Sequence, residues 1–146
     1  MRVLLINPPY RCVTSDKGLG HQTPLGLLCI GGPLLDAGHT VQLHDAELLH
    51  SSDAELLAAM AAFAPDVVMT GHAGSTPAHL SCLRVLQLAK RHHAGVLTVY
   101  GGVYPTYHAA DILHEHGCVD VVVRGEGEAV ALALVQALAQ AASATS

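Results

Sequence analysis

The chain has 146 residues, which fits one domain over residues 1–146 with a single core. It carries 7 Lys and Arg against 12 Asp and Glu, with a formal net charge of −5. This excludes a general nucleic-acid binder, which needs clustered cations to neutralise phosphates. The 4 cysteines form no C-x-x-C pair, which excludes a zinc ribbon and a disulfide framework and predicts a location in the reducing cytoplasm.

Short apolar runs alternate with longer helical patterns along the chain. The expected strands are residues 3–6, 40–44, 66–71, 96–100 and 119–123. The expected helices are residues 24–35, 53–63, 76–93, 106–116 and 126–140, with Thr23 capping the first and Ser52 or Asp53 the second. The longest apolar run, residues 24–35, is too short to span a membrane. The last residues, 141–146, are small and polar and are expected to fray.

Five consecutive βα units with strongly apolar strands predict a parallel sheet that is buried on both faces. The expected fold is α/β, a flavodoxin-like (Rossmann-like) doubly wound sheet of five strands in the order 2-1-3-4-5, with helices on both faces. In such sheets, ligands bind in a crevice outside the carboxyl ends of the strands. The loops that follow the strands are therefore the expected site.

Four of these loops are rich in glycine, proline or hydroxyl residues: 7–10, 70–76, 101–106 and 124–128. The pair Gly101-Gly102 follows a strand, where missing side chains allow a ligand to approach the backbone closely. The alternative is a strand-to-helix turn that merely uses glycine. The first loop lacks a G-x-G-x-x-G fingerprint and the chain has no Walker A motif, which disfavours dinucleotides and ATP. A phosphoacceptor domain would need aspartates where Asn7 and Thr70 stand.

The order of six short motifs identifies a family. They are VLLINPP ending at Pro9, TPLGLL at Leu28, DAGH at His39, PDVV at Val68, GGVYPT at Thr106 and DVVVRGEGE at Glu128. In this order they resemble the N-terminal cobalamin (B12)-binding domain of B12-dependent radical SAM proteins, the group that contains the anaerobic magnesium-protoporphyrin monomethyl ester cyclase.

The resemblance implies a corrinoid whose ring lies over the strand tips and whose nucleotide tail descends beside the sheet. It implies that Thr70 bonds the base and that Gly101 and Gly102 make room for it, so that Gly102→Leu should abolish retention of the cofactor. Arg124 would pair with nearby glutamates, a propionamide or a phosphate. The full expected set is Asn7, Pro8, Pro9, Tyr10, Thr70, Gly71, His72, Ser75, Thr76, Gly101, Gly102, Val103, Tyr104, Pro105, Arg124, Gly125 and Glu126.

The identity of the axial cobalt ligand stays open. Residues 7–17 contain no histidine, so the D-x-H-x-x-G loop of the methionine-synthase type is missing, which favours a base-off state without a protein ligand. His21, Cys12, Tyr104 and His72 are the side chains placed to approach the cobalt. The spacing of the other histidines does not predict a metal site.

The chain also lacks the C-x-x-x-C-x-x-C motif that holds the cluster of a radical SAM enzyme. The resemblance therefore implies an excised or free-standing cofactor domain without catalytic residues of its own. The iron–sulfur cluster and S-adenosylmethionine would belong to a radical SAM domain elsewhere in the full-length protein, where cobalamin serves as methyl carrier or redox partner. The alternative is a regulatory or interaction domain of the same fold that binds a porphyrin or no cofactor.

Overall fold

A computed structural model describes residues 1–10, 21–73 and 76–144. Its strands are β1 (Arg2–Asn7), β2 (Thr40–Asp45), β3 (Val67–His72), β4 (Leu97–Gly102) and β5 (Val121–Val122). Its helices are α2 (Leu25–Asp36), α3 (Asp53–Phe63), α4 (Ala78–His92), α5 (Val103–Glu115) and α6 (Glu128–Ala144). All strand pairs are parallel, in the order β2-β1-β3-β4-β5. The predicted flavodoxin-like fold is confirmed.

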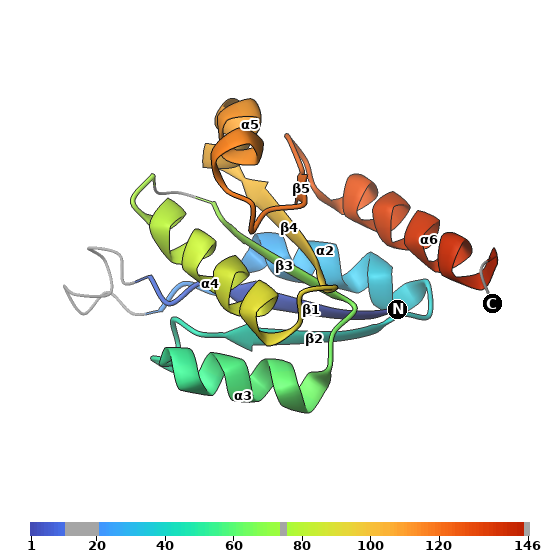
Figure 1. Cartoon of the computed structure of the whole chain (residues 1–146), viewed down its shortest axis with the longest axis horizontal. Helices are drawn as coiled ribbons and strands as arrows, with labels where there is room; N and C mark the ends of the chain where they lie inside the picture. The colour runs from blue at the N-terminus through green and yellow to red at the C-terminus, as the bar shows by residue number, and fades with distance from the viewer. Residues whose placement is uncertain (11–20, 74–75, 145–146) are drawn as a thin grey trace.

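The sheet separates two apolar layers, because successive side chains of a strand point to opposite faces. Leu4 and Ile6 of β1 pack towards α3, α4 and α5, whereas Val3 and Leu5 pack towards α2 and α6. Figure 1 shows α3 and α4 together on one side of the sheet, with α2 behind it. Gly31 of α2 lets this helix lie close to β1, since a Cβ there would sit 3.1 Å from Leu5 Cδ1. None of the helices in the described part of the chain combines the length and apolarity needed to cross a bilayer.

Several element ends differ from the sequence prediction. β4 continues through Gly101 and Gly102, and α5 begins at Val103, three residues early, because Gly102 makes the whole turn with φ at 108°. α6 begins two residues late and extends to Ala144, so residues 141–144 are helical rather than frayed. Thr23 does not cap α2 through its side chain. The predicted cap of α3 is confirmed, since Ser52 forms a reciprocal capping box with Glu55.

A buried polar group attaches the short strand β5 to β4. The hydroxyl of Thr98 lies 2.8 Å from the Cys118 carbonyl and 2.9 Å from Asp120 Oδ2, and the Thr98 amide donates to the same carboxylate oxygen at 2.8 Å. Lys90 of α4 donates to that oxygen at 2.5 Å. Partial burial by itself raises the pKa of Asp120, but the hydrogen bonds from Lys90 and Thr98 outweigh it and lower the pKa. These hydrogen bonds hold β5 against β4, and the chain continues from β5 into α6.

We predict that Thr98→Val lowers the free energy of unfolding by about 1–3 kcal/mol, because Thr98 is fully buried and its partners lose a hydrogen bond. Urea denaturation followed by circular dichroism measures this change. Thr40→Val, at the exposed start of β2, is the matched control and should change stability by less than about 0.5 kcal/mol. Equal losses in the two variants would contradict the role given to Thr98.

Candidate functional site

Two glycines stand side by side where the central strands end. Gly71 of β3 pairs with Gly101 of β4, and both follow Met69 and Val99 on the face covered by α2 and α6. A Cβ on Gly71 would lie 2.5 Å from the Gly101 carbonyl oxygen, so the approach of the two backbones requires glycine. The last inward-facing position of each central strand is therefore without a side chain.

A cavity of about 390 Å³ lies over this glycine pair. Met69 and Val99 form its floor, Leu27 and Ile30 of α2 form one wall, and Ala131 of α6 belongs to the other. Gln22, Thr23, Pro24 and Gly26 from the start of α2 also line it, and sequence reasoning did not assign them to the site. The sequence feature that could have identified them is Thr23-Pro24 at the start of α2, because this helix begins at the carboxyl edge of the sheet.

The predicted site residues divide into three groups. Eight of them line the cavity: Asn7, Thr70, Gly71, His72, Gly101, Gly102, Gly125 and Glu126. A second group does not belong to its lining: Pro8, Pro9, Tyr10, Thr76, Val103, Tyr104, Pro105 and Arg124. Ser75 and the axial-ligand candidate Cys12 lie outside the described residues.

Thr70 borders the cavity, but its hydroxyl lies on the opposite face of the sheet. Side chains alternate along β3, so Thr70 faces α4 while Met69 and Gly71 face α2 and α6. The hydroxyl donates to the Ile6 carbonyl at 2.8 Å, and the side chain is only 2% exposed. The structure thus places the Thr70 hydroxyl, which the resemblance assigned to a nucleotide base, on the face of the sheet away from the cavity.

Tyr104 packs into an aromatic stack on the α4 side. Its ring centroid lies 4.3 Å from that of His79 and 4.3 Å from that of His108. His79 Nδ1 also lies 3.0 Å from the Tyr100 hydroxyl. Burial, followed by the nearby His116 and His108, lowers the pKa of His79. The stack anchors the first turn of α5 rather than presenting Tyr104 to the cavity.

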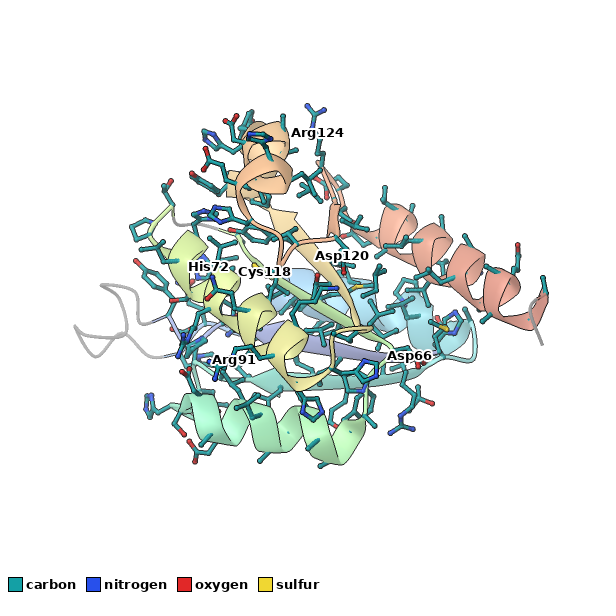
Figure 2. All side chains as sticks on the ribbon, in the orientation of Figure 1. Asp66, His72, Arg91, Cys118, Asp120 and Arg124 are labelled. Atoms are coloured by element: carbon teal, nitrogen blue, oxygen red, sulfur yellow. The ribbon has the colours of Figure 1, made fainter. Side chains whose placement is uncertain are left out.

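His72, at the end of β3, is the histidine among the predicted site residues that lines the cavity. Its ring makes an edge-on contact with Tyr10, with the centroids 5.4 Å apart. Burial lowers the pKa of His72, although the negative charge of Glu47 opposes the shift. Figure 2 shows His72, the last residue of β3, and Asp66, which directly precedes β3, at opposite ends of the sheet. Across the described ranges, no group of three or more His, Cys, Asp or Glu is arranged to hold a metal ion.

Thr106 attaches the loop after β5 to the start of α5. Its hydroxyl lies 2.7 Å from the Gly102 carbonyl and accepts a bond from the Gly125 amide at 3.0 Å. Arg124 Nε donates to the Thr106 carbonyl at 3.1 Å, and Figure 2 shows the Arg124 side chain extending outward from the fold. This guanidinium contact differs from the glutamate, propionamide or phosphate pairings expected from the sequence. The RGEGE segment is thus held in place by the neighbouring helix.

An acidic corner of the cavity was not predicted. Asn7 Nδ2 donates to Asp45 Oδ1 at 2.8 Å and lies 3.4 Å from Glu47 Oε2. His21 Nε2 lies 2.7 Å from Asp45 Oδ2. Asn7 and Glu47 line the cavity and are 4% and 8% exposed. The available signal was the position of two acids at the end of β2 and just beyond it, at the same edge of the sheet as the glycine pair.

The fold and the cavity define a class of protein, a flavodoxin-like α/β domain with a ligand-sized space at the carboxyl edge of its sheet. The chain belongs to the B12 binding domain family, whose profile matches residues 13–135. This confirms the family resemblance identified in the sequence.

Curated relatives come from longer proteins. The anaerobic magnesium-protoporphyrin IX monomethyl ester cyclase of Synechocystis sp. is 45% identical over 138 residues, which are 94% of this chain and 28% of that protein. Hopanoid C-3 methylase of Methylococcus capsulatus is 33% identical over 143 residues, 96% of this chain and 26% of that protein. The chain thus spans about a quarter of the length of these relatives.

Solved structures share the fold at low sequence identity. The radical S-adenosylmethionine methyltransferase TsrM from Kitasatospora setae superposes with a TM-score of 0.80 and 19% identity, covering 96% of this chain and 26% of that chain. The cobalamin-dependent S-adenosylmethionine radical enzyme OxsB gives a TM-score of 0.72 and 16% identity, covering 95% of this chain and 19% of that chain.

We predict that Gly102→Ala destabilises the protein more than Gly101→Ala. Gly102 has φ at +108°, and a Cβ there would lie 2.7 Å from the His72 carbonyl oxygen. A Cβ at Gly101 meets only ordinary contacts, the nearest at 3.8 Å from Val123 Cβ. Thermal melting should show a lower Tm for Gly102→Ala, by several degrees. Equal Tm values for the two variants would contradict the backbone strain argued for position 102. The same strain makes Gly102→Leu a poor test of cofactor binding, because the variant would be destabilised whether or not it binds.

We also predict that stability falls as the pH drops from about 7.5 to about 5.5. Burial lowers the pKa values of His44, His72 and His79 below the ordinary pKa of a histidine, about 6.5. In this window the unfolded chain binds protons that the folded chain does not, so acid favours unfolding. Urea unfolding across the window should show a shallower pH dependence in His79→Gln than in wild type. His114→Gln, on the exposed end of α5, is the control and should keep the wild-type slope.

Proposed function

We propose that this chain is a cobalamin-binding module that holds the nucleotide tail of the corrinoid in the cavity between β3, β4, α2 and α6. The corrin ring would lie over the carboxyl ends of the strands. The observation that carries the proposal is the glycine pair Gly71–Gly101, which leaves the cavity face of both central strands without side chains at their ends. A family profile over residues 13–135 supports the same ligand.

The chemistry of the cavity fits a nucleotide tail. The floor of Met69 and Val99 and the wall of Leu27 and Ile30 are apolar and suit a planar heterocyclic base. Gly101 leaves space for the base to approach the strand. The starts of α2 and α6 border the cavity, and the first turn of a helix suits a phosphate group such as the phosphodiester of the tail.

When bound, cobalamin would supply a cobalt centre that carries a methyl group or an electron. The role of the residues is to bind and orient the cofactor. The loop segments at 7–10, 72–73 and 124–126 would surround the ring, and Thr106 would keep the last of these against α5. We assign no axial ligand, because His72 alone among the described candidates lines the cavity and its ring already contacts Tyr10.

The proposal extends to a longer protein. In that setting a radical SAM domain, with its iron–sulfur cluster and S-adenosylmethionine, would use the bound corrinoid for methyl transfer or for oxidative cyclisation. The names of the relatives, a porphyrin ester cyclase and a hopanoid methylase, support these two reaction types. This chain would contribute the cofactor and no catalytic residue.

A binding experiment tests the proposal directly. After reconstitution with hydroxocobalamin, the wild-type protein should retain a corrin absorption spectrum through gel filtration. Gly101→Leu places a side chain in the cavity without backbone strain, so it should weaken retention by at least about tenfold. Gly117→Leu is the matched control, since Gly117 is exposed between α5 and β5 and has nothing within 4 Å of its Cβ position.

Two outcomes would contradict the proposal. One is a wild-type protein that does not retain hydroxocobalamin. The other is a Gly101→Leu variant that folds, as judged by circular dichroism, and retains the corrinoid as well as Gly117→Leu. Competition with protoporphyrin IX separates the cofactor role from a regulatory domain that binds a porphyrin, which would prefer the porphyrin.

A further inference from the structure

The innermost part of the cavity is apolar. Met69 and Val99 form its floor, are each 3% exposed, and lie two residues before the glycine pair. Ile30 of α2 lines the cavity and packs against the same apolar layer as these two residues. Apart from Thr70, the polar side chains of the described lining come from strand ends, helix starts and the loops beside them. They therefore lie at the mouth of the cavity, on the carboxyl edge of the sheet.

The backbone of the floor is committed to the sheet. β3 pairs with β1 and β4 at Met69, and β4 pairs with β3 and β5 at Val99, so both strands are bonded on both edges there. The Thr70 hydroxyl, on the opposite face, donates to the Ile6 carbonyl at 2.8 Å. The side chains of the floor are hydrocarbon and one thioether, which is a weak acceptor. A group that reaches the floor thus exchanges hydrogen bonds to water for apolar contacts.

The heterocyclic bases that end corrinoid tails differ in their polar edges. The 5,6-dimethylbenzimidazole of cobalamin has two methyl groups on its outer edge, whereas the adenine of other corrinoids has an amino group and ring nitrogens that donate and accept hydrogen bonds. Burying such groups without partners costs free energy, and the methyl groups carry no such cost. We propose that Ile30, beside the apolar floor, is a specificity-determining residue that selects a corrinoid with a benzimidazole base over one with adenine. The inference rests on the proposed function and adds the chemical class of the base.

A polar side chain at position 30 should weaken this selection. Ile30→Gln places a carboxamide beside the floor, and a glutamine amide pairs with the amino group and a ring nitrogen of adenine. Dissociation constants for hydroxocobalamin and for its adenine counterpart, measured by absorbance titration, give one ratio for each protein. The ratio of the adenine form to the benzimidazole form should fall about threefold or more in Ile30→Gln. Comparing this ratio between proteins cancels the different cobalt–base bond strengths of the two ligands.

Leu28→Gln is the matched control. It makes an aliphatic-to-glutamine change on the same helix, but Leu28 is 42% exposed and does not belong to the described cavity lining. The ratio in this variant should equal that of the wild type. Leu27→Gln, on the same wall as Ile30, provides a second measurement if circular dichroism shows that Ile30→Gln does not fold, and the same fall in the ratio is expected.

The outcomes separate selection of the base from binding of the cofactor. A ratio that falls by less than about threefold in the folded wall variant, or that falls equally in Leu28→Gln, would overturn this inference while the proposed function stands. A wild-type protein that does not bind hydroxocobalamin would overturn both.

Discussion

The close approach of two glycine backbones is the constraint on which the site depends. Gly71 and Gly101 are in register at the ends of the central strands, and no side chain fits between the first and the carbonyl of the second. This leaves a step in the sheet surface, and the apolar walls of α2 and α6 turn the step into a cavity. The next residue, Gly102, makes the turn into α5, which begins at Val103. The Thr106 hydroxyl of that helix accepts a hydrogen bond from the Gly125 amide, in the loop before α6. One local backbone feature thus sets the positions of three segments around the cavity.

The cavity combines two environments. Its floor is apolar and formed by strand residues whose positions are fixed by the core, so little ordering is needed before a flat ligand binds there. Its β1–β2 side is a polar corner in which carboxylates are held by Asn7 and His21. A ligand that fills the cavity would place an apolar part on the floor and a hydrogen-bonding part at this corner. This combination agrees with membership of the B12 binding domain family.

The sequence predicted the topology, and eight of the residues that it singled out line the cavity, because strand runs, helix periodicity and loop composition are local signals that agree with one another. The directions of individual side chains were harder to predict. Which face Thr70 occupies depends on the strand register, since a shift of one residue moves a side chain to the other face. Tyr104 packs on His79 because α5 begins three residues early, a consequence of the φ at Gly102. Asp45 and Glu47 were not predicted as site residues, because their place at the cavity is evident only from contacts with Asn7, a residue far from them in the sequence.

The attachment of β5 has a consequence for association between molecules. β5 has two residues, which pair with Val99 and Tyr100, and just before it the Asp120 amide donates to the Thr98 carbonyl at 3.2 Å. There the Thr98 amide is bound by the carboxylate of Asp120 instead of a neighbouring strand. An unpaired amide on a sheet edge is the group to which a foreign strand adds in fibril growth. With the Asp120 carboxylate bound to it, the Thr98 amide is not available to a foreign strand.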